Sequence, residues 1–258
     1  SPRLAVVAVA AALYANNDAV DGYVKHVWLA VRGNPWFANH FFEAWFPLVW
    51  FPVCCSVWLT LDFLYENVPT IRRWLHPYKL APHDARSAPS TNLGADFYVG
   101  VLLYVVPPAV LELRKAPRHL RMPEDVPGLW GLLGSVAVNM FIFDTFFFAI
   151  HLTFHKNKFL WRNVHRVHHQ DTVLRATDAN WVHVVERLSL VLSAALALTI
   201  TGAHDFVRTL YTMYAIWELV SNHSGYDLPW MPANVVPFGM LSGSERHEQH
   251  HRFAIVYF

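Results

Sequence analysis

The sequence predicts an all-α, polytopic membrane protein whose helical hairpins carry a histidine-rich metal cage at one membrane face. Composition is the first reason: 54% of the 258 residues are hydrophobic and only 15% are charged, whereas soluble domains carry about 25% charged residues. The second reason is a series of long apolar runs separated by polar, proline-containing stretches. The third is the crowding of most of the 16 histidines into the second half of the chain.

The first long apolar run covers residues 41–64 and is long enough to cross a bilayer, which takes roughly 20 residues. Pro47 and Pro52 lie inside it, and membrane helices tolerate such kinks better than soluble helices do. Glu43 and Asp62 lie near the two ends of the run, where we expect their carboxylates to reach water. The apolar stretch before this run is short for a span, so its assignment as an anchor helix stays open.

The rest of the chain alternates between polar connections and apolar runs. Prolines and a Ser/Thr cluster predict a loop over residues 66–92. Further apolar runs cover residues 97–113 and 129–151. The runs 188–202 and 206–223 are shorter and are joined by a tight turn, so we expect a helical hairpin that does not fully cross the bilayer. We divide the chain into an N-terminal membrane region with its loops and a C-terminal domain with the histidine motifs, residues 1–128 and 129–258.

Basic residues predict which end of the protein faces the cytosol. Lys and Arg are enriched in the cytosolic loops of membrane proteins, and the histidine-rich segment contains Lys156, Lys158, Arg162, Arg166, Arg175 and Arg187. Two spans between the first loop and His151 would place that loop and the histidines on the same side. The formal net charge is only +1 and no basic face stands out, which argues against nucleic acid as a partner.

Three histidine motifs have the spacing of metal ligands. Residues three or four apart share one face of a helix, so we expect the members of each motif to converge. Together the motifs offer eight imidazoles, whereas one metal takes roughly four to six ligands, so the count predicts two metals. Neutral imidazole suits iron, zinc, copper and nickel. The motifs are HLTFH with His151 and His155, HRVHH with His165, His168 and His169, and HEQHH with His247, His250 and His251.

Asp144 is an acid inside the apolar run that leads to the first motif. An ionisable residue in a span is costly and usually serves a purpose. Asp144 precedes His151 by seven residues and therefore lies on the same face of the helix. We expect Asp144 to accept a hydrogen bond from a ligand imidazole and so to fix its tautomer.

These residues resemble the membrane fatty acid hydroxylase/sterol desaturase superfamily. HLTFH matches its HxxxH box, and HRVHH and HEQHH match its two HxxHH boxes. The segment NHSGYDLPWMPANVVPFG is most similar to the cholesterol 25-hydroxylase and C4-methylsterol oxidase branches, and WLHPYKLAP resembles a loop of the same enzymes. The resemblance is strong over residues 129–258 and weaker over 71–113.

The resemblance implies a non-haem di-iron oxygenase of the endoplasmic reticulum whose site faces the cytosol. Such an enzyme uses O2, and electrons from NAD(P)H through cytochrome b5 or a reductase, to attack a C–H bond of a sterol or fatty acyl lipid. The outcome is hydroxylation or another oxidation, with desaturation also open, and zinc can replace iron during purification. The resemblance adds His223 to the eight motif histidines as a catalytic metal ligand. Four residues are expected beside the metals or as further ligands: Asp144, His183, Glu186 and Asn222.

Two other functions fit the same motifs. One is a membrane carrier or sensor that binds zinc or another metal without redox chemistry, since imidazole sites hold zinc well. The other is an inactive scaffold with a structural metal cage. In the superfamily the chain continues beyond the last HH box, whereas this sequence stops at Phe258, so we expect C-terminal truncation. Which lipid and which carbon react is not specified by the motifs.

Overall fold

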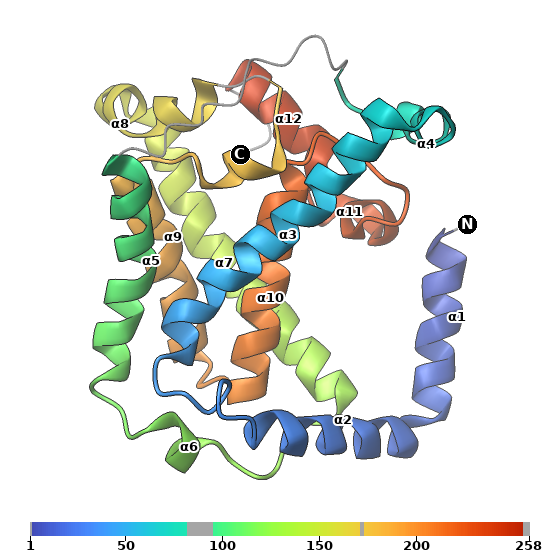
Figure 1. Ribbon diagram of the computed structural model, residues 1–258, viewed down its shortest axis with the longest axis vertical. Coiled ribbons are helices and arrows are strands. Elements are labelled where there is room, and N and C mark those ends of the chain that lie inside the picture. Colours follow the sequence, from blue (N-terminus) through green and yellow to red (C-terminus); the bar gives the residue numbers. More distant parts are fainter. Residues whose placement is uncertain (1, 82–94, 171–172, 255–258) are drawn as a thin grey trace.

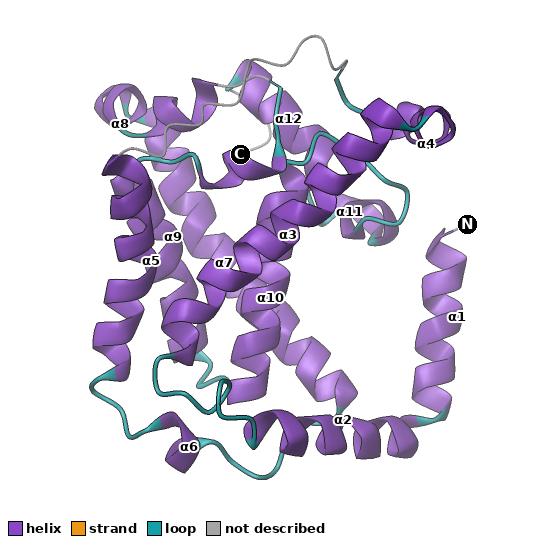
Figure 2. Cartoon of the chain, viewed as in Figure 1, coloured by secondary structure: helices purple, strands orange, loops and turns teal. Residues whose placement is uncertain are grey.

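The computed structural model describes residues 2–81, 95–170 and 173–254. This part of the chain is built of helices and contains no β-strand, only one isolated antiparallel bridge between Lys79 and Tyr226 (Figure 2). The predicted all-α fold class is therefore confirmed.

The long helices run between the two ends of the molecule. They are α3 (Phe42–Asn67), α5 (Ala95–Glu112) and α7 (Leu129–Lys156), together with the hairpin of α9 (Val184–Ile200) and α10 (Asp205–Asn222) (Figure 1). Helix α10 packs against both α3 and α7, while α9 packs against α5 and α7. Helix α10 therefore lies between α3 and the helix α7 that carries the first histidine motif.

The N-terminal helices are arranged differently. Helices α1 (Pro2–Ala15) and α2 (Asn17–Arg32) meet at an angle of 87°, and α2 lies across the lower end of the molecule in Figure 1. Trp28 of α2 is fully buried and its ring packs against Phe37 and Phe206. This aromatic cluster closes the end of the bundle that is remote from the histidines.

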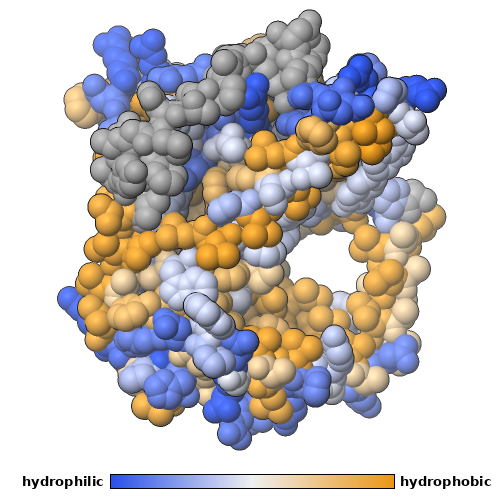
Figure 3. Space-filling view, in the orientation of Figure 1, coloured by the Kyte–Doolittle hydropathy of each residue, from blue (hydrophilic) through white to orange (hydrophobic). Residues whose placement is uncertain are grey.

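Among the described residues, two helices are long and apolar enough to cross a membrane: α3 with 26 residues and α7 with 28 residues. The bent pair of α1 and α2 would add a third span if it counts as one. The apolar part of α5, Leu102–Glu112, is shorter than a span. Figure 3 shows an apolar band across the middle of the molecule between hydrophilic ends, as expected for an integral membrane protein.

The segment after α3 is more helical than predicted. Helix α4 (Pro69–Leu75) and the 3-10 turn η1 (His76–Tyr78) occupy part of the stretch that was expected to be loop. Proline is tolerated in the first turn of a helix because its missing N–H would have no partner there, so Pro69 starts α4 rather than breaking it. The rest of the predicted loop, from residue 82, lies outside the described residues until α5 begins.

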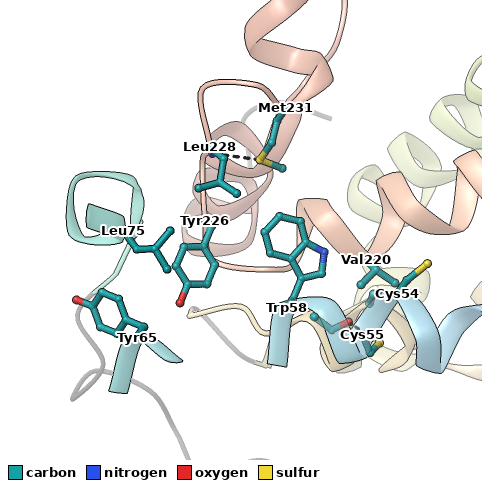
Figure 4. Packing of buried hydrophobic residues seen from close by; sticks show 11 residues of the cluster. Cys54, Cys55, Trp58, Tyr65, Leu75, Val220, Tyr226, Leu228 and Met231 are labelled. Carbon is teal, nitrogen blue, oxygen red and sulfur yellow. Dashed lines mark hydrogen bonds between the residues drawn. The ribbon is translucent and has the colours of Figure 1, made fainter. Parts of the chain in front are cut away.

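Asp62 does not reach water, contrary to the sequence-based expectation. Its carboxylate forms an ion pair with the buried Lys79 and accepts a hydrogen bond of 2.8 Å from the hydroxyl of Tyr226. Burial of a charge is costly unless it is paired, and Lys79 supplies the pair. Tyr226 lies in the core cluster of Figure 4, near Trp58 and Leu75.

Two backbone hydrogen bonds hold the same region together. The N–H of Leu80 donates to the carbonyl of Gly225 at 3.1 Å, and that of Asp227 donates to the carbonyl of Tyr78 at 2.8 Å. These bonds join the end of η1 to the loop that follows α10. The two sequence segments WLHPYKLA and NHSGYDLP therefore pack against each other.

Glu43 is also ion-paired, at the end of the bundle remote from the histidines. Its carboxylate accepts hydrogen bonds from Arg118 at 2.8 Å and from Arg208 at 2.6 Å. Arg118, in the short helix α6 (Arg118–Arg121), is completely buried and lies 3.1 Å from Asp205. Glu43 stays partly exposed, with 16% of its side chain accessible, and two arginines from other elements also reach it.

The opposite end is made of short helices. Helix α8 (Lys158–Asn163) and the 3-10 segments η3 (His165–Gln170) and η4 (Ala176–Asn180) follow α7. Helix α11 (Pro232–Val235), the turn η5 (Pro237–Gly239) and α12 (Gly243–Phe253) follow α10. Helices α4, α8 and α12 all lie at the upper end in Figure 1, so the histidines and the first loop share one side, as predicted.

Candidate metal centre

Nine histidines gather where α7, η3, α10 and α12 meet. They form two groups, and within each group one nitrogen from every ring lies within 4.8 Å of the others. The five-histidine group comprises His151, His155, His165, His169 and His250. The four-histidine group comprises His168, His223, His247 and His251. The structure thus brings together all nine histidines singled out from the sequence.

Local structure explains how the chain returns to α7. Asn157 ends α7 with an extended backbone conformation, and its side chain caps α8 by accepting from the N–H of Phe159 at 2.9 Å. Asn is a favoured helix N-cap because it satisfies N–H groups of the first turn. The resulting bend carries η3 back against the end of α7, so His165 reaches His155.

Gly243 starts the helix that carries the last motif. It has a φ of 72°, which L residues rarely adopt, and a Cβ at this position would lie 2.5 Å from the Cβ of Ala233. Glycine is thus needed both for the backbone conformation and for close packing against α11. Next to it, the hydroxyl of Ser244 donates to the carbonyl of Ser221 at 2.9 Å, which fixes α12 against the end of α10.

The two HxxHH motifs divide their histidines between the groups, which corrects the expectation that each motif converges on one point. His165 and His169 belong to the five-histidine group and His168 to the other. In the second motif the division is reversed, with His250 alone in the five-histidine group. Adjacent residues point about 100° apart around a helix, so the HH pairs cannot aim at the same metal.

Nitrogen contacts in the five-histidine group have the arrangement of a cation site. The Nε2 atoms of His151, His155 and His250 form a triangle with sides of 3.0, 3.0 and 3.1 Å. A neutral imidazole nitrogen is either a donor or an acceptor. Among three such nitrogens at least two are of the same kind, so at least one side of the triangle joins two donors or two acceptors. A cation between the three nitrogens removes this conflict, because all three then present a lone pair.

The spacing also bears on coordination number. A metal–nitrogen bond of about 2.1 Å places neighbouring ligand nitrogens about 3.0 Å apart at right angles and about 3.4 Å apart in a tetrahedron. The Nε2 atom of His165 lies 2.8 Å from that of His155 and 3.0 Å from that of His169. Together with the triangle, these distances fit a five- or six-coordinate metal better than a tetrahedral one.

The four-histidine group also fits a metal. The Nε2 atoms of His223 and His247 lie 3.0 Å apart. Both ring nitrogens of His251 are buried without a hydrogen-bond partner, and an unpartnered buried polar group is costly. A bound metal would supply the missing partner. The ring of His251 lies 4.5 Å from that of His169, so the two groups lie next to each other.

Hydrogen bonds to Nδ1 fix the tautomer of three rings. His165 donates to the carboxylate of Glu186 at 2.9 Å, His168 to the carbonyl of Trp181 at 3.2 Å, and His223 to the carbonyl of Leu219 at 2.7 Å. Main-chain carbonyls, and the carboxyl of Glu186 when it is ionised, can only accept, so Nδ1 carries the proton in these contacts. The Nε2 lone pair is then free for a metal, which is the usual arrangement of a ligand histidine.

The same rings are neutral at physiological pH. Burial lowers the pKa of His165 and of His223 to about 4 and that of His168 to about 3. The pKa of His247 is held well below its usual value by burial and by neighbouring imidazoles, of which His223 contributes most. Burial raises the pKa of Glu186 to about 7. A low pKa keeps the imidazole in the form that binds metal.

The other predicted site residues have different surroundings. Asp144 is exposed on the surface of α7, and no hydrogen bond joins it to His151 among the described residues. Seven residues along a helix are about 10 Å apart, so the shared face does not bring the two groups into contact. The ring of Phe147 lies against His151 instead, with centroids 5.5 Å apart.

His183 and Asn222 lie outside both groups. His183 is the N-cap of α9, where its Nδ1 accepts from the N–H of Val185 at 3.2 Å. Asn222 is the last residue of α10, next to His223, and its Oδ1 is buried without a partner. Of the four residues expected near the metals, Glu186 is therefore the one that contacts a ring of either group.

Trp161 of α8 was not predicted from the sequence. Its ring lies against the five-histidine group, with centroids 5.1 Å from His155 and 5.2 Å from His169. The available signal was an aromatic residue four positions before His165 in an otherwise basic stretch. The side chain is half-buried, so it connects the group with the molecular surface.

The chain is similar in sequence to known proteins. The chain matches the fatty acid hydroxylase family over residues 136–257. It is 33% identical to cholesterol 25-hydroxylase of Mus musculus over 230 residues, which is 88% of this chain and 75% of that protein. The human cholesterol 25-hydroxylase is 32% identical over 226 residues, with 87% and 79% covered.

A more distant relative is a very-long-chain aldehyde decarbonylase of Oryza sativa, which is 32% identical over 124 residues. The aligned residues make up 48% of this chain and 46% of that protein. No solved structure matches the chain. The segment shared with the family contains all nine histidines of the two groups.

Proposed function

The chain belongs to the fatty acid hydroxylase/sterol desaturase superfamily, and we propose that it is an integral membrane hydroxylase that inserts oxygen from O2 into a C–H bond of a sterol. The observation that carries the proposal is the pair of histidine groups at the end of the apolar helix α7. A fatty acyl chain is the second substrate class. The sterol comes first because the relatives that cover most of this chain are named as sterol hydroxylases.

The metals proposed for the two groups are two iron ions, which cycle between Fe2+ and Fe3+. Imidazole binds iron and zinc alike, but the nitrogen spacing of the five-histidine group favours more than four ligands. When bound, the iron pair supplies the electron transfer to O2 that hydroxylation needs. The proposed ligands are the nine histidines of the two groups, with Glu186 orienting His165.

The overall reaction sets the electron requirement. One C–H bond, one O2, two electrons and two protons give one alcohol and one water. We assign the electrons to NAD(P)H, delivered by cytochrome b5 or by a reductase at the cytosolic face of the endoplasmic reticulum. This orientation is supported by the basic residues next to the histidines, since Lys and Arg mark cytosolic loops.

The residues of α7 lead from the apolar region to the metals. The rings of Phe143 and Phe147 are stacked with centroids 5.7 Å apart, and Phe147 contacts His151. They form an apolar wall one and two turns before the first ligand. In the proposed function this wall orients the lipid and keeps water away from His151, so that the reactive carbon meets the metals rather than solvent.

The function is tested by reconstituting the full chain with iron in lipid nanodiscs. Addition of cholesterol and a reducing system should produce one hydroxylated sterol for each O2 consumed. Metal analysis of the same sample should give two iron ions per chain. A folded sample that retains only zinc, or that holds two irons but consumes no O2 with any lipid, would contradict the proposal.

A further inference from the structure

Electrons must reach the five-histidine group from outside the protein if the proposed function is right. Two electrons are needed for each turnover, and their donor has to approach the metal site from the polar end of the molecule. Helix α8 covers that end directly after α7. We therefore expect the electron donor to approach the five-histidine group over α8.

Trp161 is a residue of α8 whose ring lies against the five-histidine group. Its ring lies 5.1 Å from His155, 5.2 Å from His169 and 5.8 Å from His165, measured between ring centroids. All three histidines belong to the five-histidine group. Because Trp161 is half-buried, one part of its ring system faces these imidazoles while another part reaches the surface.

The surface around Trp161 is positively charged. Residues 145–170 contain four Lys and Arg residues and no Asp or Glu. Lys158, Arg162 and Arg166 are exposed, and none of them has an ion-pair partner among the described residues. Figure 3 shows the hydrophilic surface over α8.

Cations at the opposite end of the bundle are arranged differently. Arg118 and Arg208 are paired with Glu43, and Lys25 lies 3.7 Å from Asp125. These three cations are balanced by carboxylates of the protein. Lys158 and Arg162 of α8 have no ion-pair partner in the part of the chain that the structure describes, so their charge is available to a partner with negative charge.

We propose that the exposed basic surface formed by Lys158 and Arg162 of α8 and Arg166 of η3 docks an acidic electron-carrier protein, and that Trp161 is the contact through which electrons pass to the five-histidine group. The inference rests on the proposed function. In each transfer the reduced carrier is oxidised by one electron, and two transfers with two protons complete the reduction of O2 to water and alcohol.

An anionic membrane surface is the competing occupant. Phe159 of α8 is 70% exposed, and lipid head groups also attract basic helices. A protein donor is favoured because a lipid head group makes no use of the ring that connects the surface with the histidines. The experiment below separates the two.

Docking is tested by binding, with the soluble haem domain of cytochrome b5 as the probe and the full chain in uncharged nanodiscs. Lys158→Glu/Arg162→Glu should weaken binding at least about tenfold at low ionic strength, and the wild-type affinity should fall as salt is added. Lys25→Glu/Arg114→Glu is the matched control, with the same charge change at the opposite end, and should leave binding unchanged. Equal losses in both variants, or no loss in the α8 variant, would overturn the proposal.

The same variants are then tested on vesicles of anionic phospholipid. If Lys158→Glu/Arg162→Glu abolishes vesicle binding but leaves binding of the haem domain intact, the basic surface serves the membrane and the proposal is wrong. We expect the opposite: Lys158→Glu/Arg162→Glu should lose more affinity for the haem domain than for the vesicles. Metal content plays no part in either binding measurement.

The role of Trp161 is tested by the rate at which the reduced haem is oxidised by the iron-loaded protein. Trp161→Leu should slow this rate at least about tenfold without changing haem-domain affinity, and Trp161→Phe should be intermediate. Iron content must stay at the wild-type level in both variants. An unchanged oxidation rate in Trp161→Leu would overturn the assignment.

A chemical reductant separates this inference from the proposed function. Dithionite needs no docking surface, so a single turnover driven by it should be the same in wild type, Trp161→Leu and the α8 variant. If wild type forms no product even with dithionite, the proposed function fails. If wild type, Trp161→Leu and the α8 variant form the same amount of product with dithionite, and also with the protein donor, only the docking proposal fails.

Discussion

Nδ1 of His165 lies 2.9 Å from the carboxylate of Glu186, and both side chains are buried. His165 occupies the middle of the five-histidine group, with Nε2 contacts to His155 and His169. Glu186 is in the first turn of α9, where the helix dipole favours a negative charge. The pair thus couples the orientation of a proposed ligand to the start of the hairpin that packs against α7.

Removal of Glu186 should weaken metal binding. Loss of a hydrogen-bond acceptor behind a ligand histidine typically costs about 10–100-fold in metal affinity or activity. Glu186→Ala should fall in this range, and Glu186→Gln should be milder because its amide oxygen still accepts from His165. Iron affinity is measured by competition with a chelator. Glu124→Gln, at the opposite end, is the control, and equal affinities in all four proteins would contradict the proposed role.

Adjacent histidines should hold different metals. His168→Ala and His169→Ala each remove one ring, but from different groups. Each variant should retain about one iron per chain, and the double variant should lose both. Metal analysis of folded protein checks the result. His183→Ala, which removes only the N-cap of α9, should keep two irons while losing about 1 kcal/mol of stability.

A two-metal assignment would be wrong if His168→Ala and His169→Ala both kept two irons. It would also be wrong if either single variant lost all its iron while the other lost none. Folding of each variant is checked by circular dichroism before metal is measured, so that global unfolding is not mistaken for loss of a ligand.

The ion-pair network around Arg118 should determine stability rather than metal content. Arg118 is fully buried and contacts both Glu43 and Asp205. Removing one partner of a buried ion pair typically costs about 3–5 kcal/mol, because a charge stays buried without compensation. Arg118→Met should lower the thermal unfolding temperature in detergent accordingly.

The exposed pair of Lys25 and Asp125 provides the control for that experiment. Surface pairs contribute about 0–1 kcal/mol, so Lys25→Met should have little effect. Both variants should retain two irons in the folded fraction. An unfolding temperature of Arg118→Met equal to that of wild type would show that the network does not contribute to stability.

Acid should destabilise the metal-free protein. The pKa of His165 and His223 is lowered to about 4 and that of His168 to about 3, whereas an unfolded histidine has a pKa of about 6.5. Between these values the unfolded chain binds protons that the folded chain does not, so stability falls as pH falls from about 6.5 to about 4. The raised pKa of Glu186, about 7, acts in the opposite direction but is a single group.

Thermal unfolding of metal-free protein across this pH range measures the effect. The unfolding temperature should fall steadily as the buffer is acidified, and replacing His165 and His223 together by Gln should flatten the curve. A curve that rises on acidification in the wild type would mean that the imidazoles are not buried as neutral rings. Iron should shift the fall to lower pH, since protons and metal compete for the same nitrogens.

The sequence predicted the helices and the histidines well because both have strong local patterns. The apolar run that was expected over residues 129–151 is helical from Leu129 to Lys156, and the spacing of the histidines reveals their shared helical faces. The prolines of α3 did not end the helix, as expected for an apolar environment.

Tertiary contacts account for what the sequence did not reveal. The partners of Asp62, namely Lys79 and Tyr226, are 17 and 164 residues away, so no local pattern indicates that its charge is neutralised. The division of each HxxHH motif between two groups depends on where the other motif lies. The expectation for Asp144 considered the angle around the helix but not the distance along it, and that distance excludes contact with His151.

The most direct test of the proposed function follows oxygen atoms. The iron-loaded protein is given cholesterol, a reducing system and isotopically labelled O2, and the sterol product is analysed by mass spectrometry. The account predicts an alcohol that carries one labelled oxygen atom, formed by wild type and lost in both His168→Ala and His169→Ala. An alcohol whose oxygen comes from water, or no oxidised lipid from protein that holds two irons and receives electrons, would contradict it.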